Sequence, residues 1–190
     1  MRKVRVIFVV AISAFFTGCP VRSLQPLFSE KDLTYNPALV GKWADGEDIY
    51  SFSRANENEY AILLTEQKPT DSTTNARAEV DTITFVGRLG RLGKNWFLDT
   101  YPARETGDFH LLPTHIIAKV RIEGDTLTLA SLEGDWLKKM LKAGHLRTEC
   151  TLVDGDVILT GPTKEIQQMV RKYADDENAF PGPEKFVRVK

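Results

Sequence analysis

The sequence has few cysteines and no long hydrophobic run, and each shortage excludes a class of protein. Two cysteines in 190 residues, Cys19 and Cys150, cannot form the disulfide framework of a small secreted domain. The uncharged and mostly apolar run 6–16 has eleven residues, whereas a membrane-spanning helix needs about 20. The run is therefore too short for a stable transmembrane anchor.

The chain also lacks a strong charge of either sign and the common catalytic motifs. Its 25 basic and 26 acidic residues give a net charge of −1, which provides no basic surface for nucleic acid. It contains no Gly-x-Ser-x-Gly, Ser-x-x-Lys or His-Glu-x-x-His motif. Gly87, Gly90 and Gly93 are not followed by the Lys-Ser/Thr pair of a phosphate-binding loop, so we expect a loop or bulge between strands there.

The only candidates for a catalytic cluster are the histidines His110, His115 and His145, and the candidate polar site lies around the first two. His110 and His115 are five positions apart, with Glu105 and Asp108 shortly before them. This spacing places the imidazoles on opposite faces of a strand and matches no common helical metal pair. The segment either supplies a metal or acid–base site or forms only local hydrogen bonds. We predict no other catalytic residue and no metal ligand.

The N-terminus has the organisation of an export signal. Basic residues precede the apolar run, and the small residue Gly18 leads directly into Cys19. The sequence Phe-Thr-Gly-Cys at 16–19 resembles the lipobox of bacterial lipoproteins. The resemblance implies cleavage between Gly18 and Cys19, with S-diacylglycerol and an N-acyl group such as palmitate on Cys19. Because two acyl chains already give stable anchoring, three would fix the protein to a membrane.

This resemblance divides the chain into three parts. Residues 1–18 form a cleaved signal peptide, 19–38 a lipidated cysteine with a flexible tether, and 39–190 a single globular domain. Without the three basic residues of the signal peptide, the net charge is −4. Pro20 stands where an Asp would resemble an inner-membrane retention signal. We therefore expect the cell envelope, with the outer membrane facing the periplasm favoured over the inner membrane.

Alternating apolar and polar residues predict a mainly β, β-rich α+β domain. Gly124-Asp125 and Asp154-Gly155 supply turns for the two clearest hairpins. A bulge or turn near Asp81-Thr82 would absorb a change of face in one strand. The predicted strands are 49–53, 60–64, 76–85, 96–98, 116–122, 126–130, 147–153, 157–160 and 187–189. This pattern fits an antiparallel meander sheet or a closed barrel.

Two short helices accompany the strands. One covers about 135–143, with Asp135 as its N-cap and a basic face, and the other covers about 163–175, with Thr163 as its cap. The first helix either covers a sheet edge or barrel end or lies on lipid headgroups. Cys150 falls on the inward face of a strand and is predicted to be a buried core thiol rather than a reactive one.

Gly41-Lys42-Trp43 opens the folded domain after a turn at Asn36-Pro37. A Gly-x-Trp at the first strand resembles the signature of the lipocalins and wider calycins. The resemblance implies a calycin-like β-barrel with Gly41 and Trp43 at one end, where the tryptophan acts as a plug. The second lipocalin motif, Thr-Asp-x-x-Tyr, is absent, so an ordinary buried tryptophan on a first strand is the other interpretation.

Three classes of function fit an anchored β-rich domain. The first is a non-catalytic, lipocalin-like module that binds an apolar or amphipathic small molecule between sheet and helices. The second is an envelope assembly or scaffold lipoprotein that binds another protein, and the third is an enzyme that uses the His110/His115 loop. We rank them in this order, with the membrane as a partner and no cofactor besides the acyl groups. The alternation of apolar and polar residues does not distinguish these classes of function, because barrels with filled interiors and barrels with hollow interiors show the same alternation.

Overall fold

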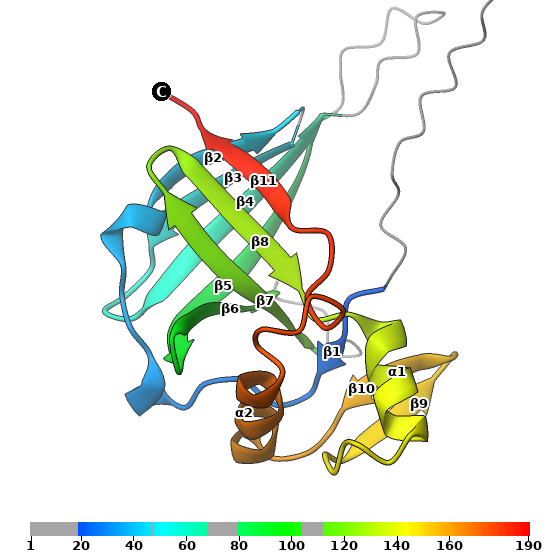
Figure 1. Cartoon of the computed structure of the whole chain (residues 1–190). Helices are drawn as coiled ribbons and strands as arrows, with labels where there is room; N and C mark the ends of the chain where they lie inside the picture. The colour runs from blue at the N-terminus through cyan, green and yellow to red at the C-terminus, as the bar shows by residue number, and fades with distance from the viewer. Residues whose placement is uncertain (1–18, 47, 68–79, 104–111) are drawn as a thin grey trace, which may run out of the picture.

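The computed structural model describes residues 19–46, 48–67, 80–103 and 112–190 (Figure 1). The expected signal peptide with Gly18, the first part of the strand predicted at 76–85, and His110 lie outside the described residues.

Eight antiparallel strands close into a β-barrel (Figure 1). They are β2 Gly41–Asp45, β3 Asp48–Arg54, β4 Glu59–Gln67, β5 Val80–Leu92, β6 Asn95–Pro102, β7 His115–Glu123, β8 Thr126–Ser131 and β11 Glu184–Arg188. From β2 to β8 each strand pairs with the next, and β11 closes the barrel by pairing with both β8 and β2. The predicted mainly β class is confirmed, and the sheet is a barrel rather than an open meander.

A second group of elements lies outside the barrel wall (Figure 1). It comprises β1 Arg22–Ser23, the 3-10 helix η1 Glu30–Asp32, α1 Gly134–Lys142, β9 Cys150–Val153, β10 Asp156–Leu159 and α2 Thr163–Lys172. β1 pairs antiparallel with the start of β7 and parallel with β10, and β10 pairs with β9. The barrel sheet therefore continues from β7 into a small outer sheet whose edge strand is β9.

Both predicted hairpin turns are confirmed. Gly124 lies between β7 and β8 with a φ of 57°, in the left-handed region that glycine favours. Asp154 and Gly155 join β9 to β10 with φ values of 52° and 86°, and two consecutive positive values are typical of a type I′ turn. β9 is shorter than the strand predicted at 147–153, and Leu152 is exposed rather than facing the core.

The glycine-rich segment is part of a strand, so the loop or bulge predicted there is wrong. β5 continues through Gly87 and Gly90, and the chain turns only at Gly93, which has a φ of 65°. A Cβ on Gly87 would lie 2.6 Å from Cδ1 of Ile62. A Cβ on Gly90 would lie 2.5 Å from Cε1 of Phe28. The glycines therefore permit close packing on the two faces of β5.

The bulge or turn predicted near Asp81-Thr82 is also absent. Residues Val80 to Arg88 of β5 pair with successive residues of β4 without interruption. The part of the predicted strand before Val80 lies outside the described residues.

Both helices form where the sequence predicts them, but their caps differ. The N-cap of α1 is Glu133, whose carboxylate accepts hydrogen bonds from the amides of Asp135 and Trp136. Thr163 is the first residue of α2, and its hydroxyl donates to the carbonyl oxygen of Pro26 instead of capping the helix. Among the described residues, no helix is long and apolar enough to cross a bilayer.

Side chains fill the barrel interior. The buried cluster consists of Leu39, Trp43, Phe52, Tyr60, Ile62, Leu89, Leu98, Val120, Leu127 and Phe186. Trp43, Tyr60 and Leu127 have no accessible surface, so no water-sized space adjoins them. This part of the interior is a packed core, as in other small barrels whose side chains meet across the axis.

A second hydrophobic core lies between the barrel wall and the outer elements. Phe97 of β6 and Ile117 of β7 point outward and are fully buried. The residues that cover them and pack in the same core include Val21, Leu27, Phe28, Trp136, Leu137, Val157, Leu159, Ile166, Val170 and Phe180. The central barrel strands therefore bury both of their faces.

Residues 19–34 form part of this second core, and the flexible tether expected at 19–38 is not what the structure shows. Leu27 and Phe28 are fully buried, and the amide of Val21 donates to the carbonyl oxygen of Leu132 at 2.9 Å. The amide of Thr34 donates to the carbonyl oxygen of Leu89 at 2.8 Å. The segment lacks periodicity because it binds an existing wall through isolated contacts rather than through a long strand or helix of its own.

Trp43 is buried at one end of the barrel beneath the 3-10 helix η2 Pro37–Leu39. Its Nε1 donates to the carbonyl oxygen of Leu39 at 2.9 Å. The guanidinium of Arg188 stacks on the indole at 4.0 Å and donates to the carbonyl oxygens of Ala38 and Val40. The indole is thus held between η2 and Arg188, and its role as a barrel plug stays a prediction.

The same arrangement explains why position 41 is a glycine. Its φ is 131°, and a Cβ there would lie 2.5 Å from Nη1 of Arg188. Any other residue would strain the backbone and displace the guanidinium from the indole.

We expect Trp43→Ala to lower the free energy of unfolding by about 3–5 kcal/mol, because it removes a large aromatic side chain from a packed site. The matched control is Val187→Ala on β11, a residue that is 60% exposed, which should change stability by no more than about 0.5 kcal/mol. Chemical denaturation of the chain from Cys19 onward measures both. Equal, small effects would show that the barrel does not depend on Trp43.

Candidate functional site

His115, the described member of the predicted histidine pair, contacts a buried carboxylate. It is the first residue of β7, and its Nδ1 lies 2.7 Å from Oδ1 of Asp99. Asp99 is fully buried, and its Oδ2 accepts a hydrogen bond of 2.8 Å from the amide of Leu27. The ring of Tyr101 packs against the imidazole with 4.9 Å between centroids. Asp99 thus ties the barrel wall to the N-terminal segment.

A hydrolytic triad consists of an imidazole, a carboxylate and a nucleophilic hydroxyl. The hydroxyl on the strand next to His115 belongs to Ser23, and its hydrogen bonds are already used within its own turn. Ser23 pairs with His115 across β1 and β7. Its hydroxyl donates to the carbonyl oxygen of Gln25 at 2.6 Å, accepts from the amide of Gln25 at 3.2 Å, and is fully buried. In the part of the chain that the structure describes, no group of three His, Cys, Asp or Glu residues could hold a metal. The geometry favours local hydrogen bonding for His115.

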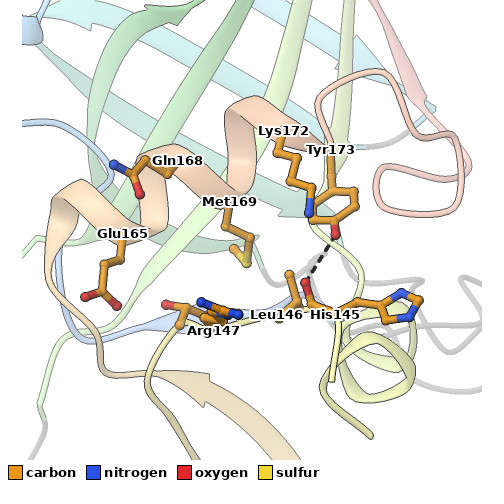
Figure 2. Close-up of a pocket in the computed structure, with 9 residues that line it drawn as sticks. His145, Leu146, Arg147, Glu165, Gln168, Met169, Lys172 and Tyr173 are labelled. Carbon is orange, nitrogen blue, oxygen red and sulfur yellow. Dashed lines mark hydrogen bonds between the residues drawn. The ribbon is translucent and has the colours of Figure 1, made fainter. Parts of the chain in front are cut away.

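A cleft of about 390 Å³ lies between α2 and residues 145–148. Figure 2 shows α2 contributing one wall and the chain after α1 contributing the other. The lining residues are His145, Leu146, Arg147, Thr148, Glu165, Gln168, Met169, Lys172 and Tyr173. The cleft therefore combines two apolar side chains with hydroxyl, amide and charged groups, and its lining is more polar than that of most small-molecule sites.

The amphipathic sequence of α2 builds one wall of the cleft. Ile166 and Val170 are buried in the outer core, which turns Gln168 and Lys172 toward the cleft. The hydroxyl of Tyr173, just after the helix, donates to the carbonyl oxygen of His145 at 3.4 Å and joins the two walls (Figure 2).

The other wall of the cleft, residues 145–148, is held in place by hydrogen bonds between Glu149 and the residues that follow β10. The amides of Thr160 and Gly161 donate to the carbonyl oxygen of Glu149 at 3.0 and 3.1 Å. A Cβ on Gly161 would lie 3.0 Å from Oγ1 of Thr148 and 3.1 Å from the amide nitrogen of Glu149. Gly161 therefore permits the close approach that places Arg147 and Thr148 in the cleft.

Several polar side chains that line the cleft have no hydrogen-bond or ion-pair partner among the described residues. Oγ1 of Thr148 is buried and has no hydrogen-bond partner among the described residues. Arg147 forms no hydrogen bond or ion pair with any described residue, and Nζ of Lys172 contacts only the face of Tyr173, at 4.8 Å. With Glu165 as the one acid in the lining, the cleft has a small positive excess and can accept an anionic group.

The end of the barrel near β3 and β11 has the opposite character. Glu184 is half-buried there, and desolvation raises the pKa of its carboxyl, with a further increase from the negative charges of Asp45 and Asp48. Since the folded-state pKa is raised, ionisation of Glu184 costs stability as the pH rises through it. An anionic ligand would be repelled at this end, so the cleft is the better candidate site.

Cys150 lies on β9, close to the cleft. It is half-buried against the outer core, and burial raises the pKa of its thiol. A raised pKa keeps the thiol protonated and unreactive, in agreement with the predicted structural role, although the residue is less buried than predicted.

Comparison of the chain with protein-family models, with curated proteins and with solved structures finds no match. The class of the protein therefore follows from its geometry. It is a closed eight-stranded antiparallel barrel, compatible with a lipocalin-like binding module, with a polar cleft outside the barrel.

Of the cleft residues, the sequence analysis named only His145 as a candidate, and it did not relate that residue to the others. Arg147 precedes β9 and Lys172 ends α2, and no local pattern relates the two positions. The one available signal was the amphipathic pattern of 163–175, which predicts a packed face and an open face but not what the open face meets.

We expect Asp99→Ala to lower the free energy of unfolding by about 3 kcal/mol, because it leaves the buried amide of Leu27 without an acceptor and removes the partner of His115. His115→Ala should cost less, about 1–2 kcal/mol, since the Leu27 hydrogen bond remains. Denaturation measures both changes, and metal analysis of the wild type serves as the control. A stoichiometric metal that His115→Ala abolishes would contradict the local hydrogen-bonding role.

Proposed function

We propose that the protein is a lipid-anchored envelope binding module whose cleft between α2 and residues 145–148 holds a small amphipathic molecule with an anionic group. The observation that carries this proposal is the pair of cations in the cleft lining, Arg147 and Lys172, neither of which pairs with an acid among the described residues. The hydroxyl of Thr148 is itself buried and lies against Gly161, so an anionic group in the cleft would meet the two cations rather than this hydroxyl.

The barrel fold supports a binding role, but its packed interior moves the site outward. In a hollow barrel the ligand lies on the axis, where Trp43, Tyr60 and Leu127 are fully buried in this protein. The volume of the cleft, about 390 Å³, is within the range of roughly 300–1,000 Å³ that small-molecule sites occupy.

The chemistry of the lining suggests how such a ligand would lie. Arg147 and Lys172 would bind its anionic group through charge-assisted hydrogen bonds. Leu146 and Met169 offer apolar surface to the rest of the molecule, and the flexible thioether of Met169 adapts to different chain shapes. The same surface offers no nucleophile activated by a base, which favours binding over catalysis.

The anchoring part of the proposal rests on the lipobox at 16–19 and on the exposure of Cys19. An exposed thiol at the start of the described chain can accept acyl groups without disturbing either core. With Pro20 after it, we place the protein at the outer membrane, facing the periplasm.

The cleft is tested with octyl phosphate, a short anionic amphiphile, by isothermal titration calorimetry. The chain from residue 19 onward with Cys19→Ser avoids detergent, which would compete with the probe. We expect Arg147→Gln with Lys172→Gln to weaken binding by about tenfold or more, because two charge-assisted contacts are lost.

The matched control is Lys139→Gln with Lys142→Gln, which makes the same change of charge on the exposed side of α1. It should bind octyl phosphate as the wild type does. Equal affinity of all three proteins, or no binding to the wild type at millimolar probe, would contradict the cleft as the ligand site. Native mass spectrometry of the wild type then identifies any ligand that it retains.

A further inference from the structure

Cys19 is fixed against the folded domain rather than separated from it. Its carbonyl oxygen accepts a hydrogen bond of 3.2 Å from the amide of Gly134, and Pro20 forms a β-bridge with Glu133. A Cβ on Gly134 would lie 2.8 Å from the carbonyl oxygen of Cys19, so glycine permits this close approach. Acyl chains on Cys19 would therefore bring one particular face of the domain to the bilayer.

That face contains the tip of the β9–β10 hairpin. Sγ of Cys19 lies 3.8 Å from Oδ2 of Asp156, the first residue of β10. Asp156 pairs directly with Val153 across the hairpin. In Figure 1 the start of the described chain, α1 and the β9–β10 hairpin lie in the same region of the domain.

The hairpin exposes two large apolar side chains next to this turn. Leu152 is 69% exposed and Val153 is 43% exposed. Since neighbouring residues of a strand point to opposite faces, the two side chains project from both sides of the hairpin. A flat protein partner would cover one side, whereas insertion of the tip into a lipid interface would bury both.

Two carboxylates lie at the tip. Asp154 is exposed in the turn itself, so insertion must leave its carboxylate at the level of the lipid headgroups. Asp156 is bonded to Arg22 at 2.9 Å and lies 4.0 Å from Nζ of Lys138. Its negative charge is therefore balanced by Arg22 and, at a longer distance, by Lys138, which also pairs with Asp135. The exposed lysines of α1, Lys139 and Lys142, add positive charge to the same part of the domain.

We infer that the tip of the β9–β10 hairpin, with Leu152 and Val153, inserts into the headgroup and acyl boundary of the bilayer that holds the acyl chains of Cys19. The inference rests on the lipid anchoring proposed above. It names a membrane-contacting surface, so the domain has a fixed orientation on the membrane instead of moving freely about its anchor.

The test uses an environment-sensitive NBD label on the lipidated protein. The full-length gene is expressed in a bacterial host, with Leu152→Cys in a Cys150→Ser background, and the purified product is reconstituted into phosphatidylcholine vesicles with 20% phosphatidylglycerol. Val187→Cys in the same background is the control, since Val187 is also exposed but lies on β11 of the barrel. Circular dichroism verifies that both variants fold.

We expect the label at position 152 to shift its emission to the blue and to be quenched by doxyl lipids, while the label at 187 behaves as in water. Aqueous emission from both positions on protein whose Cys19 carries acyl chains by mass spectrometry would overturn the inference alone. Absence of acyl mass would overturn the anchoring and the inference together.

A Cys19→Ser version separates the bilayer from other occupants. Without vesicles, its label at 152 should emit as in water. A blue shift in that protein would show that a second copy covers the hairpin, and the membrane assignment would then be wrong.

Discussion

The outer face of β6 and β7 is apolar, and the rest of the structure depends on how this face is covered. Antiparallel strands commonly carry one apolar and one polar face, but Phe97 and Ile117 point outward and are as buried as the interior. Exposure of each would cost about 1.5–3 kcal/mol. The segment 19–34, α1, α2 and β10 cover them, so barrel and outer layer form one domain with two cores.

Local patterns in the sequence predict most of the barrel, because alternation and turn chemistry are local properties. Asp154-Gly155 specifies its turn through the backbone conformation that those two residues tolerate. The glycines of β5 were misread because their reason is distant in sequence: Gly90 makes room for the ring of Phe28. The packing of the segment 19–34 and the cleft were not predicted for the same reason. A single side chain in a segment without periodicity does not indicate which distant part of the chain it contacts.

The β9–β10 hairpin connects the two proposed surfaces. The cleft residue Thr148 lies shortly before β9, and the exposed tip is at Val153. At about 3.3 Å per residue in an extended chain, the two ends are separated by about 17 Å. If the tip is in the lipid boundary, the cleft lies just outside the headgroups, where an anionic amphiphile leaving the bilayer would meet Arg147 and Lys172.

The central claim is that the N-terminal segment is part of the fold, so that Cys19 is held at a fixed place on the domain. Native-state hydrogen exchange at the amide of Leu27, which donates to the buried carboxylate of Asp99, tests this most directly. The account predicts that this amide exchanges as slowly as those of Phe97 and Ile117 in the central strands, because opening it exposes the second core. Exchange at the rate of an unprotected peptide would contradict the claim and leave the segment a tether.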